Sequence, residues 1–254
     1  KGVLMTRLIA ALLLGATTAL ASPALAFDIS AMTEAEKAAF GQAVRDYLME
    51  NPQVLIESIN VLETRQAETA AQSDLELVAA NRQAIFEDGH SWVGGNPDGD
   101  LTMVEFIDYR CGVCRQFNQE VHDAVEEDGN IKLILKEFPI LGEDSEQSSR
   151  FAIAVLQVGG DAAYRAAHDA LITLRTPASP EALRGIAETV GVDADEVLAR
   201  MSSEGVTRVL DQNHQLGQTM AIQGTPTFII GDQMLRGVPR AGVAATIAQI
   251  RESM

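Results

Sequence analysis

Cysteine is nearly absent from this chain, which has only Cys111 and Cys114 among its 254 residues. Two cysteines are too few for a four-thiol zinc site or for a small fold stapled by several disulfides. They lie three positions apart in the run Cys111-Gly112-Val113-Cys114, where two sulfurs can close a small disulfide ring or reopen as a dithiol. The scarcity and the spacing together indicate redox chemistry.

Positive charge is also scarce, with 19 Lys and Arg residues against 36 Asp and Glu residues and a formal net charge of −17. A protein this acidic is repelled by nucleic acid and by anionic lipid, so no nucleic-acid partner is expected. Membrane-spanning runs are missing beyond the first 26 residues. The chain also lacks a Walker-type phosphate loop, a dinucleotide-binding fingerprint and a nucleophile elbow, and no cofactor is expected.

Residues 1–26 have the organisation of a secretory signal peptide. Arg7 supplies the basic region, residues 8–20 an apolar stretch, and Ala24-Leu25-Ala26 a small-x-small cleavage site. A membrane anchor is the alternative, but the apolar stretch is shorter than the roughly 20 residues that a spanning helix needs. We therefore expect export to the periplasm. Since the removed segment carries Lys1, Arg7 and no acid, cleavage leaves 228 residues and changes the formal charge from −17 to −19.

Residues 27–88 are charged, rich in Ala and Glu and almost free of glycine, which predicts helices. Thr33 and Glu36 fit a capping box, and Asn51-Pro52 ends one helix and starts a second. The second helix carries an apolar stripe at Leu55, Ile59 and Leu62.

Such a stripe must be buried, either on the following domain or against identical helices of other subunits. We interpret the segment as an oligomerisation arm. A solvated arm is the alternative, and the heptad pattern is too short to give the number of subunits.

The rest of the chain alternates strands and helices, which is typical of an α/β fold. The Gly- and Pro-containing residues 89–100 predict a turn-rich boundary. Strands are expected at 101–107, 131–138, 227–230 and 233–236, and helices from the cysteines to about 127, across 145–220 and at 240–252. Ser179-Pro180, Gly191 and the pair Asp193 and Glu196 mark helix ends within the long helical block.

The run from Glu105 to Cys114, together with Gly224-Thr225-Pro226-Thr227-Phe228, resembles the thioredoxin-fold family of exported disulfide oxidoreductases typified by DsbA. This resemblance implies a thioredoxin fold whose first half (89–144) and second half (222–254) flank an inserted helical domain (145–221). Pro226 lies 115 residues after Cys111, which leaves room for the insert. The preceding helices are similar to those of the ScsC-type branch (suppressor of copper sensitivity protein C), some members of which trimerise and act as disulfide isomerases.

Within this family Cys111 is expected to be an exposed nucleophile at a helix N-terminus, where the helix dipole stabilises its thiolate. Cys114 would resolve the mixed disulfide with a client protein. Strongly oxidising relatives carry a histidine between the cysteines, whereas this chain has Gly112-Val113, so a milder redox potential is expected. A buried, inert disulfide is the alternative.

The segment Gly224-Thr225-Pro226 is expected to form a cis-proline loop facing the cysteines. Such a loop leaves the preceding backbone N–H and C=O free to pair with an extended client strand, so these residues and Gly112-Val113 are candidates for substrate binding. Without the family resemblance the segment is simply a turn before a strand.

Glu105 and Lys136 are charged residues on strands that are expected to be buried. An isolated buried charge is costly, so each should have a partner or a proton-transfer role. The resemblance implies that both lie beneath the cysteines and assist proton transfer to the resolving thiol. Alternatively, both lie solvated at an edge of the sheet.

The four histidines, His90, His122, His168 and His214, include no pair at helical i, i+4 spacing. None has a cysteine or carboxylate at a spacing typical of a metal site, so no metal is expected.

These observations predict a periplasmic thiol–disulfide oxidoreductase that acts as a disulfide isomerase or reductase on client proteins through Cys111 and Cys114. An isomerase needs reduced Cys111, which implies a membrane-embedded electron donor, and the ScsC resemblance favours a homotrimer. Two alternatives stay open. One is a monomeric or dimeric dithiol oxidase, and the other is a copper-tolerance protein whose soft thiolates bind Cu(I).

Overall fold

The computed structural model describes residues 32–253, so the signal peptide predicted at residues 1–26 lies outside the described part of the chain. The chain divides into a first unit that ends at Leu62 and a second that begins at Glu63. Among the described helices, none combines the length and the apolar character needed to cross a lipid bilayer.

The first unit contains helix α1 (Glu34–Glu50) and the beginning of helix α2 (Gln53–Ala80). The predicted capping box is present, because the Thr33 N–H donates to Glu36 Oε2 at 2.8 Å and the Glu36 N–H donates to Thr33 Oγ1 at 3.4 Å. No side chain of α1 is buried. The large apolar side chains that this unit exposes are Phe40, Val44, Tyr47, Met49, Leu55, Ile56, Ile59, Val61 and Leu62.

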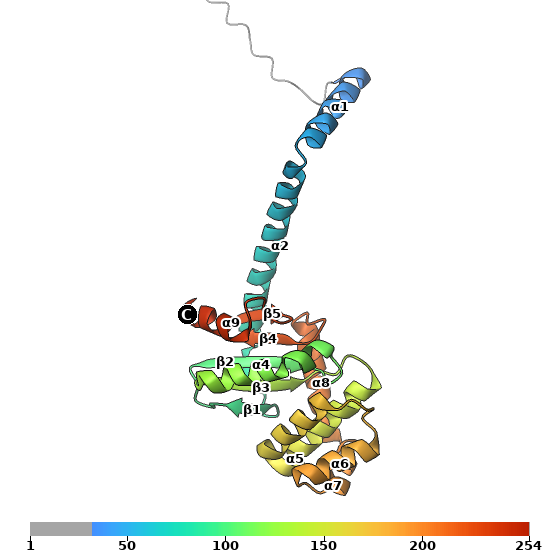
Figure 1. Cartoon of the computed structure of the whole chain (residues 1–254), viewed down its shortest axis with the longest axis vertical. Coiled ribbons are helices and arrows are strands. Elements are labelled where there is room, and N and C mark those ends of the chain that lie inside the picture. The colour runs from blue at the N-terminus through green and yellow to red at the C-terminus, as the bar shows by residue number, and fades with distance from the viewer. Residues whose placement is uncertain (1–31, 254) are drawn as a thin grey trace, which may run out of the picture. The chain divides into compact units, whose positions relative to one another are not determined.

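A five-stranded mixed sheet forms the centre of the second unit (Figure 1). Its order is β1-β3-β2-β4-β5, with bounds β1 (Trp92–Gly95), β2 (Leu101–Ile107), β3 (Ile131–Glu137), β4 (Thr227–Ile230) and β5 (Gln233–Arg236). Strands β2 and β3 are parallel, and helix α4 (Gly112–Asp128) is the crossover that a parallel pair requires. The four predicted strands are confirmed, with β3 one residue shorter than expected.

Strand β1 corrects the prediction of a turn-rich boundary at residues 89–100. It pairs antiparallel with β3 at the edge of the sheet. Gly94-Gly95 reads as a turn signal in the sequence, but contacts from elsewhere fix this segment. The Trp92 ring stacks on Tyr164 at 5.4 Å, and its Nε1 donates to the backbone oxygen of Asp161 at 3.1 Å.

Alternation along the strands divides the core between the two faces of the sheet. On one face Met103 and Ile107 of β2 join a cluster with α4, the insert and helix α9 (Val243–Ser253). On the other face Val104 and Phe106 join a cluster with helix α3 (Arg82–Phe86) and the end of helix α8 (Glu204–Thr219). This separation decides which buried charges can reach the cysteines.

The predicted helical insert is present as α5 (Glu143–Thr173), α6 (Pro180–Val190), α7 (Ala194–Arg200) and α8, of which α5, α6 and α7 lie together in Figure 1. The predicted helix ends are also present. Ser179 caps α6 by accepting from the Ala182 N–H, and Asp193 caps α7 by accepting from the Glu196 N–H. Gly191 ends α6 in the left-handed region, with φ 79°.

The last part of the predicted arm, residues 63–88, belongs to the second unit. Val78 and Ile85 are fully buried in the cluster on the α3 face of the sheet. Asp74 of α2 forms an ion pair with Arg236 of β5. The exposed apolar stripe is therefore confined to residues before Glu63, whereas the rest of α2 and α3 help to build the core.

Candidate active site

The chain enters the site through a turn that Asp108 holds in place. This residue follows β2 and is fully buried. Its Oδ1 accepts from the Arg110 N–H at 2.7 Å, and its backbone oxygen accepts from the Cys111 N–H at 3.1 Å. Its Oδ2 accepts from the N–H groups of Ile140 and Leu141 at 2.8 and 3.0 Å. Asp108 thus ties the start of α4 to the loop after β3.

Cys111 occupies the N-cap position of α4, with the Cys114 N–H donating to its Sγ at 3.4 Å. The thiol donates in turn to the backbone oxygen of Thr225 at 3.1 Å. Cys111 and Cys114 are not joined by a disulfide in this structure. The Sγ of Cys111 lies at the end of α4 where the first backbone N–H groups have no partner within the helix.

The structure corrects the expectation that Cys111 is exposed. The residue is only 7% exposed, because the loop that carries Thr225 lies against it. The neighbouring Gly112 and Val113 are exposed, so the site is open to solvent on the side of these two residues.

The peptide bond between Thr225 and Pro226 is cis. Gly224 is exposed, Thr225 is half-buried and Pro226 is buried. The structure therefore brings the two separate sequence motifs, Cys111–Cys114 and Gly224–Pro226, together into one site.

Cys114 and Glu105 lie beneath this surface, with exposed fractions of 1% and 2%. Burial raises the pKa of Glu105 to about 8. Burial, and then the charge of Glu105, raise the pKa of the Cys114 thiol. The charge of Glu105 thus acts on the Cys114 thiol from within the same buried layer.

Lys136 does not join them, contrary to the prediction. In the parallel register Lys136 is the partner of Phe106, while Glu105 is the partner of Leu135, so the two charged side chains point to opposite faces of the sheet. Lys136 forms an ion pair with Asp88 and donates to the backbone oxygen of Ala84 at 3.0 Å. Burial would raise the pKa of Asp88, but the charge and hydrogen bond of Lys136, with help from Ser91, lower it to about 2.

A buried polar network that the sequence did not reveal links the site to the insert. Tyr109, two residues before Cys111, and Tyr164 of α5 both donate to Glu137 Oε1, at 2.8 and 2.6 Å. Burial raises the pKa of Glu137 to about 7, although these hydrogen bonds oppose the shift. His168 lies 3.2 Å from the Tyr109 hydroxyl through Nδ1. Only the alternation of polar and apolar residues in β3 and α5 could have hinted at this network.

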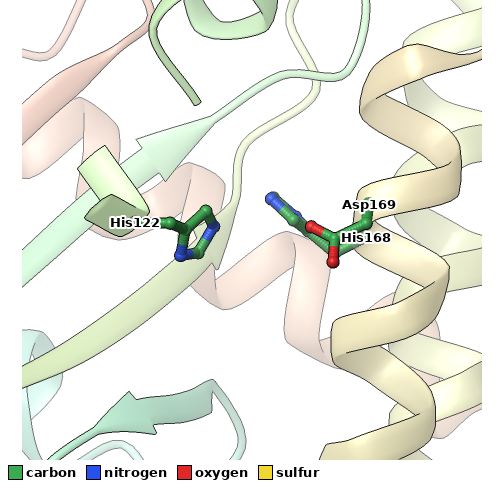
Figure 2. Close-up of side chains that lie close together, drawn as sticks. All are labelled: His122, His168 and Asp169. Carbon is green, nitrogen blue, oxygen red and sulfur yellow. The ribbon is translucent and has the colours of Figure 1, made fainter. Parts of the chain in front are cut away.

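His122, His168 and Asp169 are the one group among the described residues whose potential metal-ligand atoms all lie within 4.8 Å of one another (Figure 2). Most of their ligand atoms are already engaged, although the buried His122 Nε2 has no hydrogen-bond partner within the described part of the chain. Arg165 donates to His122 Nδ1 and pairs with Asp169 at 3.1 Å. Because an arginine can only donate, the proton of neutral His122 must be on Nε2, which removes that nitrogen as a ligand.

His168 uses both ring nitrogens, Nδ1 toward Tyr109 and Nε2 toward Asn118 at 2.8 Å. Burial, followed by the charge of Arg165, lowers the pKa of His122 to about 4. A guanidinium group at the centre of the cluster also repels a cation. The residues present therefore fit a hydrogen-bonded core better than a metal centre.

Exposed apolar side chains are present on the segments next to the cysteines, namely Val113, Ile140 and Leu141, with exposed fractions of 43%, 39% and 54%. Asp108 fixes the backbone of Ile140 and Leu141 beside the start of α4. The apolar residues directly after Pro139 were the sequence signal for this patch. Exposed apolar groups at a reactive site favour contact with unfolded or flexible polypeptide.

Comparison with known proteins agrees with this geometry. Residues 102–246, more than half of the chain, match the DSBA-like thioredoxin domain. The chain belongs to this family. Residues 36–68 match the N-terminal domain of the copper resistance protein ScsC. The DSBA-like fold and the resemblance to the ScsC-type branch are thereby confirmed.

Solved structures with the DSBA-like fold include a thioredoxin-like oxidoreductase from Silicibacter pomeroyi DSS-3. It is 35% identical, with a TM-score of 0.63 over 68% of this chain and 99% of that chain. ScsC of Proteus mirabilis in a transitional conformation is 25% identical, with a TM-score of 0.61 over 87% of this chain and 98% of that chain.

Disulfide bond formation protein D of Bacillus subtilis is 24% identical over 152 residues, which are 56% of this chain and 68% of that protein. The chain spans only 22% of the length of another curated relative, the Na(+)/H(+) antiporter NhaA 1 of Salinispora arenicola. As a DSBA-like protein, the chain is a member of a thiol–disulfide oxidoreductase family that acts on substrate proteins.

Proposed function

We propose that this protein is an exported disulfide isomerase and reductase that acts on periplasmic proteins through Cys111 and Cys114. The observation that carries the proposal is the position of Cys111 Sγ, which caps α4 and contacts the backbone of Thr225 in the cis-proline loop. This arrangement combines a helix terminus that favours a thiolate with a backbone that can pair with a client strand.

The reaction begins when the Cys111 thiolate attacks one sulfur of a client disulfide. A mixed disulfide forms and the other client sulfur leaves as a thiolate. In isomerisation that thiolate attacks elsewhere in the client and finally displaces Cys111, so no electrons are transferred in total. In reduction Cys114 attacks Cys111 Sγ, the client leaves with two thiols, and the protein retains the Cys111–Cys114 disulfide.

Glu105 serves as the proton acceptor in the second step. Cys114 must lose its proton to attack, and burial together with Glu105 disfavours its thiolate. With a pKa of about 8, Glu105 can receive a proton near neutral pH and release it again. Lys136 is not part of this step, because it lies on the other face of the sheet with Asp88.

The client occupies the surface formed by Gly112, Val113, Gly224, Thr225 and Pro226. Gly112 and Gly224 have open space where a side chain would begin, so an extended backbone can approach closely. The exposed apolar groups of Val113, Ile140 and Leu141 supply contacts that do not depend on client sequence.

The first unit assembles subunits into an oligomer, most simply a trimer. Its apolar side chains are exposed in the single chain, and residues 36–68 match the ScsC N-terminal domain. Several catalytic units held together raise the effective concentration of thiols around one client, which suits repeated attack during isomerisation. A membrane-embedded partner would supply the electrons that keep Cys111 reduced.

Two other functions use the same dithiol. A dithiol oxidase would donate the Cys111–Cys114 disulfide to clients, as in relatives named for disulfide bond formation. A copper-tolerance protein would bind Cu(I) between the two free thiols, a role favoured by the match to a copper resistance protein.

Reactivation of scrambled ribonuclease tests the proposal. Catalytic amounts of the reduced protein should restore ribonuclease activity, whereas the Cys111→Ser variant should not. Activity only as an oxidant of reduced ribonuclease would favour the oxidase. Tight Cu(I) binding against a competing chelator, without ribonuclease reactivation, would favour copper handling.

A further inference from the structure

Three arginines gather around the cysteine pair. Arg110 directly precedes Cys111, Arg115 directly follows Cys114, and Arg175 lies just beyond the end of α5. Two of them are anchored to the same backbone. Arg110 donates to the oxygens of Leu174 and Thr176 at 3.2 and 2.9 Å, and Arg115 also donates to the Leu174 oxygen.

The local negative charge does not balance these arginines. Within 4 Å Arg110 has one carboxylate, Asp144 at 3.8 Å, and in the described part of the chain Arg115 and Arg175 form no ion pair. The end of α5 adds about half a negative charge. Asp144 and the helix end thus offer about one and a half negative charges to three guanidinium groups. The carboxylate of Asp108 also lies near Arg110, but it accepts from backbone N–H groups.

The electrostatics of Arg115 reflect this imbalance. Its pKa is lowered by burial and then by repulsion from Arg110 and Arg175, with no carboxylate acting in the opposite direction. The formal net charge of the whole chain is −17, so a positive cluster at the reactive thiol is an exception to its general charge. Like charges held together by fixed backbone contacts repel one another unless an anion joins them.

The position of the cluster points to the client as the source of that anion. Arg115 is four residues after Cys111, about one helical turn further along, so it lies on the side of α4 that carries the nucleophile. Arg175 is exposed to solvent. Guanidinium groups bind carboxylates through paired hydrogen bonds in a fixed geometry.

We propose that Arg110, Arg115 and Arg175 bind carboxylates of the client polypeptide, so that the protein prefers disulfides flanked by Asp or Glu. The inference rests on the proposed thiol–disulfide exchange at Cys111 and specifies its substrate class. The chemical step is unchanged. Cys111 Sγ bonds to the client sulfur, the partner sulfur leaves as a thiolate, and the arginines orient the client without taking part in electron transfer.

Single-turnover kinetics of the full-length protein test the preference. Three peptides carry one cysteine in disulfide linkage to a neutral aromatic thiol, with Glu, Gln or Lys on both sides of the cysteine. Release of the aromatic thiol reports attack by Cys111. Each rate is divided by the rate of the same peptide with dithiothreitol, which removes the effect of the flanking charge on intrinsic reactivity.

At low ionic strength the corrected rate should be roughly fivefold higher for the Glu peptide than for the Lys peptide. The difference should vanish near 1 M salt, where screening acts within about 3 Å. In the variants Arg115→Gln and Arg175→Gln, the corrected rates of the Glu peptide and the Lys peptide should become equal. Arg208 forms an exposed ion pair with Glu204 on α8. The variant Arg208→Gln changes the net charge by the same amount and should keep the higher corrected rate of the Glu peptide.

Equal corrected rates for the three wild-type peptides would overturn the acidic preference and leave the redox function intact. Failure of the wild-type protein to react with any peptide would overturn both. Loss of the ratio in Arg208→Gln as well would attribute the preference to net charge and would also contradict the site.

Discussion

The phenol of Tyr109 donates a 2.8 Å hydrogen bond to the buried carboxyl group of Glu137. Tyr164 of α5 donates to the same oxygen at 2.6 Å. One carboxyl group therefore joins the segment that leads into Cys111, the end of β3 and the helical insert.

Tyr164→Phe keeps the ring that stacks on Trp92 but removes the hydroxyl. Since the pKa of Glu137 is about 7, its carboxyl group is largely ionised at pH 8 and protonated at pH 5. Hydrogen bonds to an ionised group are the stronger ones, so the variant should lose about 2 kcal/mol of unfolding free energy at pH 8 and less at pH 5. Urea denaturation at both pH values measures this. An equal loss at pH 5 and pH 8 would contradict a hydrogen bond to an ionised carboxyl group.

Glu105→Gln should slow resolution of the mixed disulfide, because the variant cannot accept the proton of Cys114. With a pKa of about 8, Glu105 acts as a base increasingly as pH approaches 8, so the deficit should be largest there and reach roughly tenfold. Rapid acid quenching of the mixed disulfide gives the rate. Glu127→Gln, an exposed position on α4, is the matched control. Equal resolution rates for Glu105→Gln and Glu127→Gln would contradict a proton-accepting role of Glu105.

The same substitution should stabilise the fold in a pH-dependent way. The folded pKa of Glu105, about 8, is above its ordinary value of 4.5, so the folded state holds a proton that the unfolded state releases between these values. Stability of the wild type therefore falls as pH rises through this window. The gain from Glu105→Gln should grow from below 1 kcal/mol at pH 5 to about 3 kcal/mol at pH 7. A gain in unfolding free energy that does not change with pH would contradict the raised pKa of Glu105.

Lys136→Met should destabilise the protein without slowing disulfide resolution. It removes the lysine partner of the partly buried Asp88 carboxylate, and breaking such a pair typically costs about 3 kcal/mol or more. Asp88→Asn in the same chain should recover part of the loss, because the remaining charge is removed. The unfolding free energy from urea denaturation and the rate of mixed-disulfide resolution from acid quenching are measured on the same preparations. Slower resolution of the mixed disulfide with an unchanged unfolding free energy would instead indicate a role for Lys136 in the active site.

The oligomeric state should depend on the first unit alone. Replacing Leu55, Ile59 and Leu62 with serine should reduce the solution mass to that of one chain, because the exposed apolar stripe is lost. Sedimentation equilibrium measures the mass, and ribonuclease reactivation should fall in parallel. Deletion of all residues up to 88 is a poor test of the oligomeric state, because it also removes Val78 and Ile85 from the core of the second unit. A wild-type protein that is already monomeric would refute the assembly.

The helix ends and most strands could be predicted because their causes are local. Thr33 with Glu36, Ser179-Pro180 and Asp193 each cap a helix through neighbours no more than three residues away. Strand β1 could not be predicted in this way. Its sequence is dominated by Gly94-Gly95, and the contacts that order it come from β3 and Tyr164.

The amino-acid sequence alone indicates thiol–disulfide chemistry, since a lone cysteine pair at the start of a helix and a distant Thr225-Pro226 are typical of few functions. Only the folded chain shows which of the two buried charged residues lies near Cys114. Glu105 faces Cys114 and Lys136 faces Asp88 because side chains alternate along a strand, and the register of β2 with β3 places the two residues on opposite faces. That register is set by packing between segments far apart in the chain, and the sequence pattern of a single strand does not contain it.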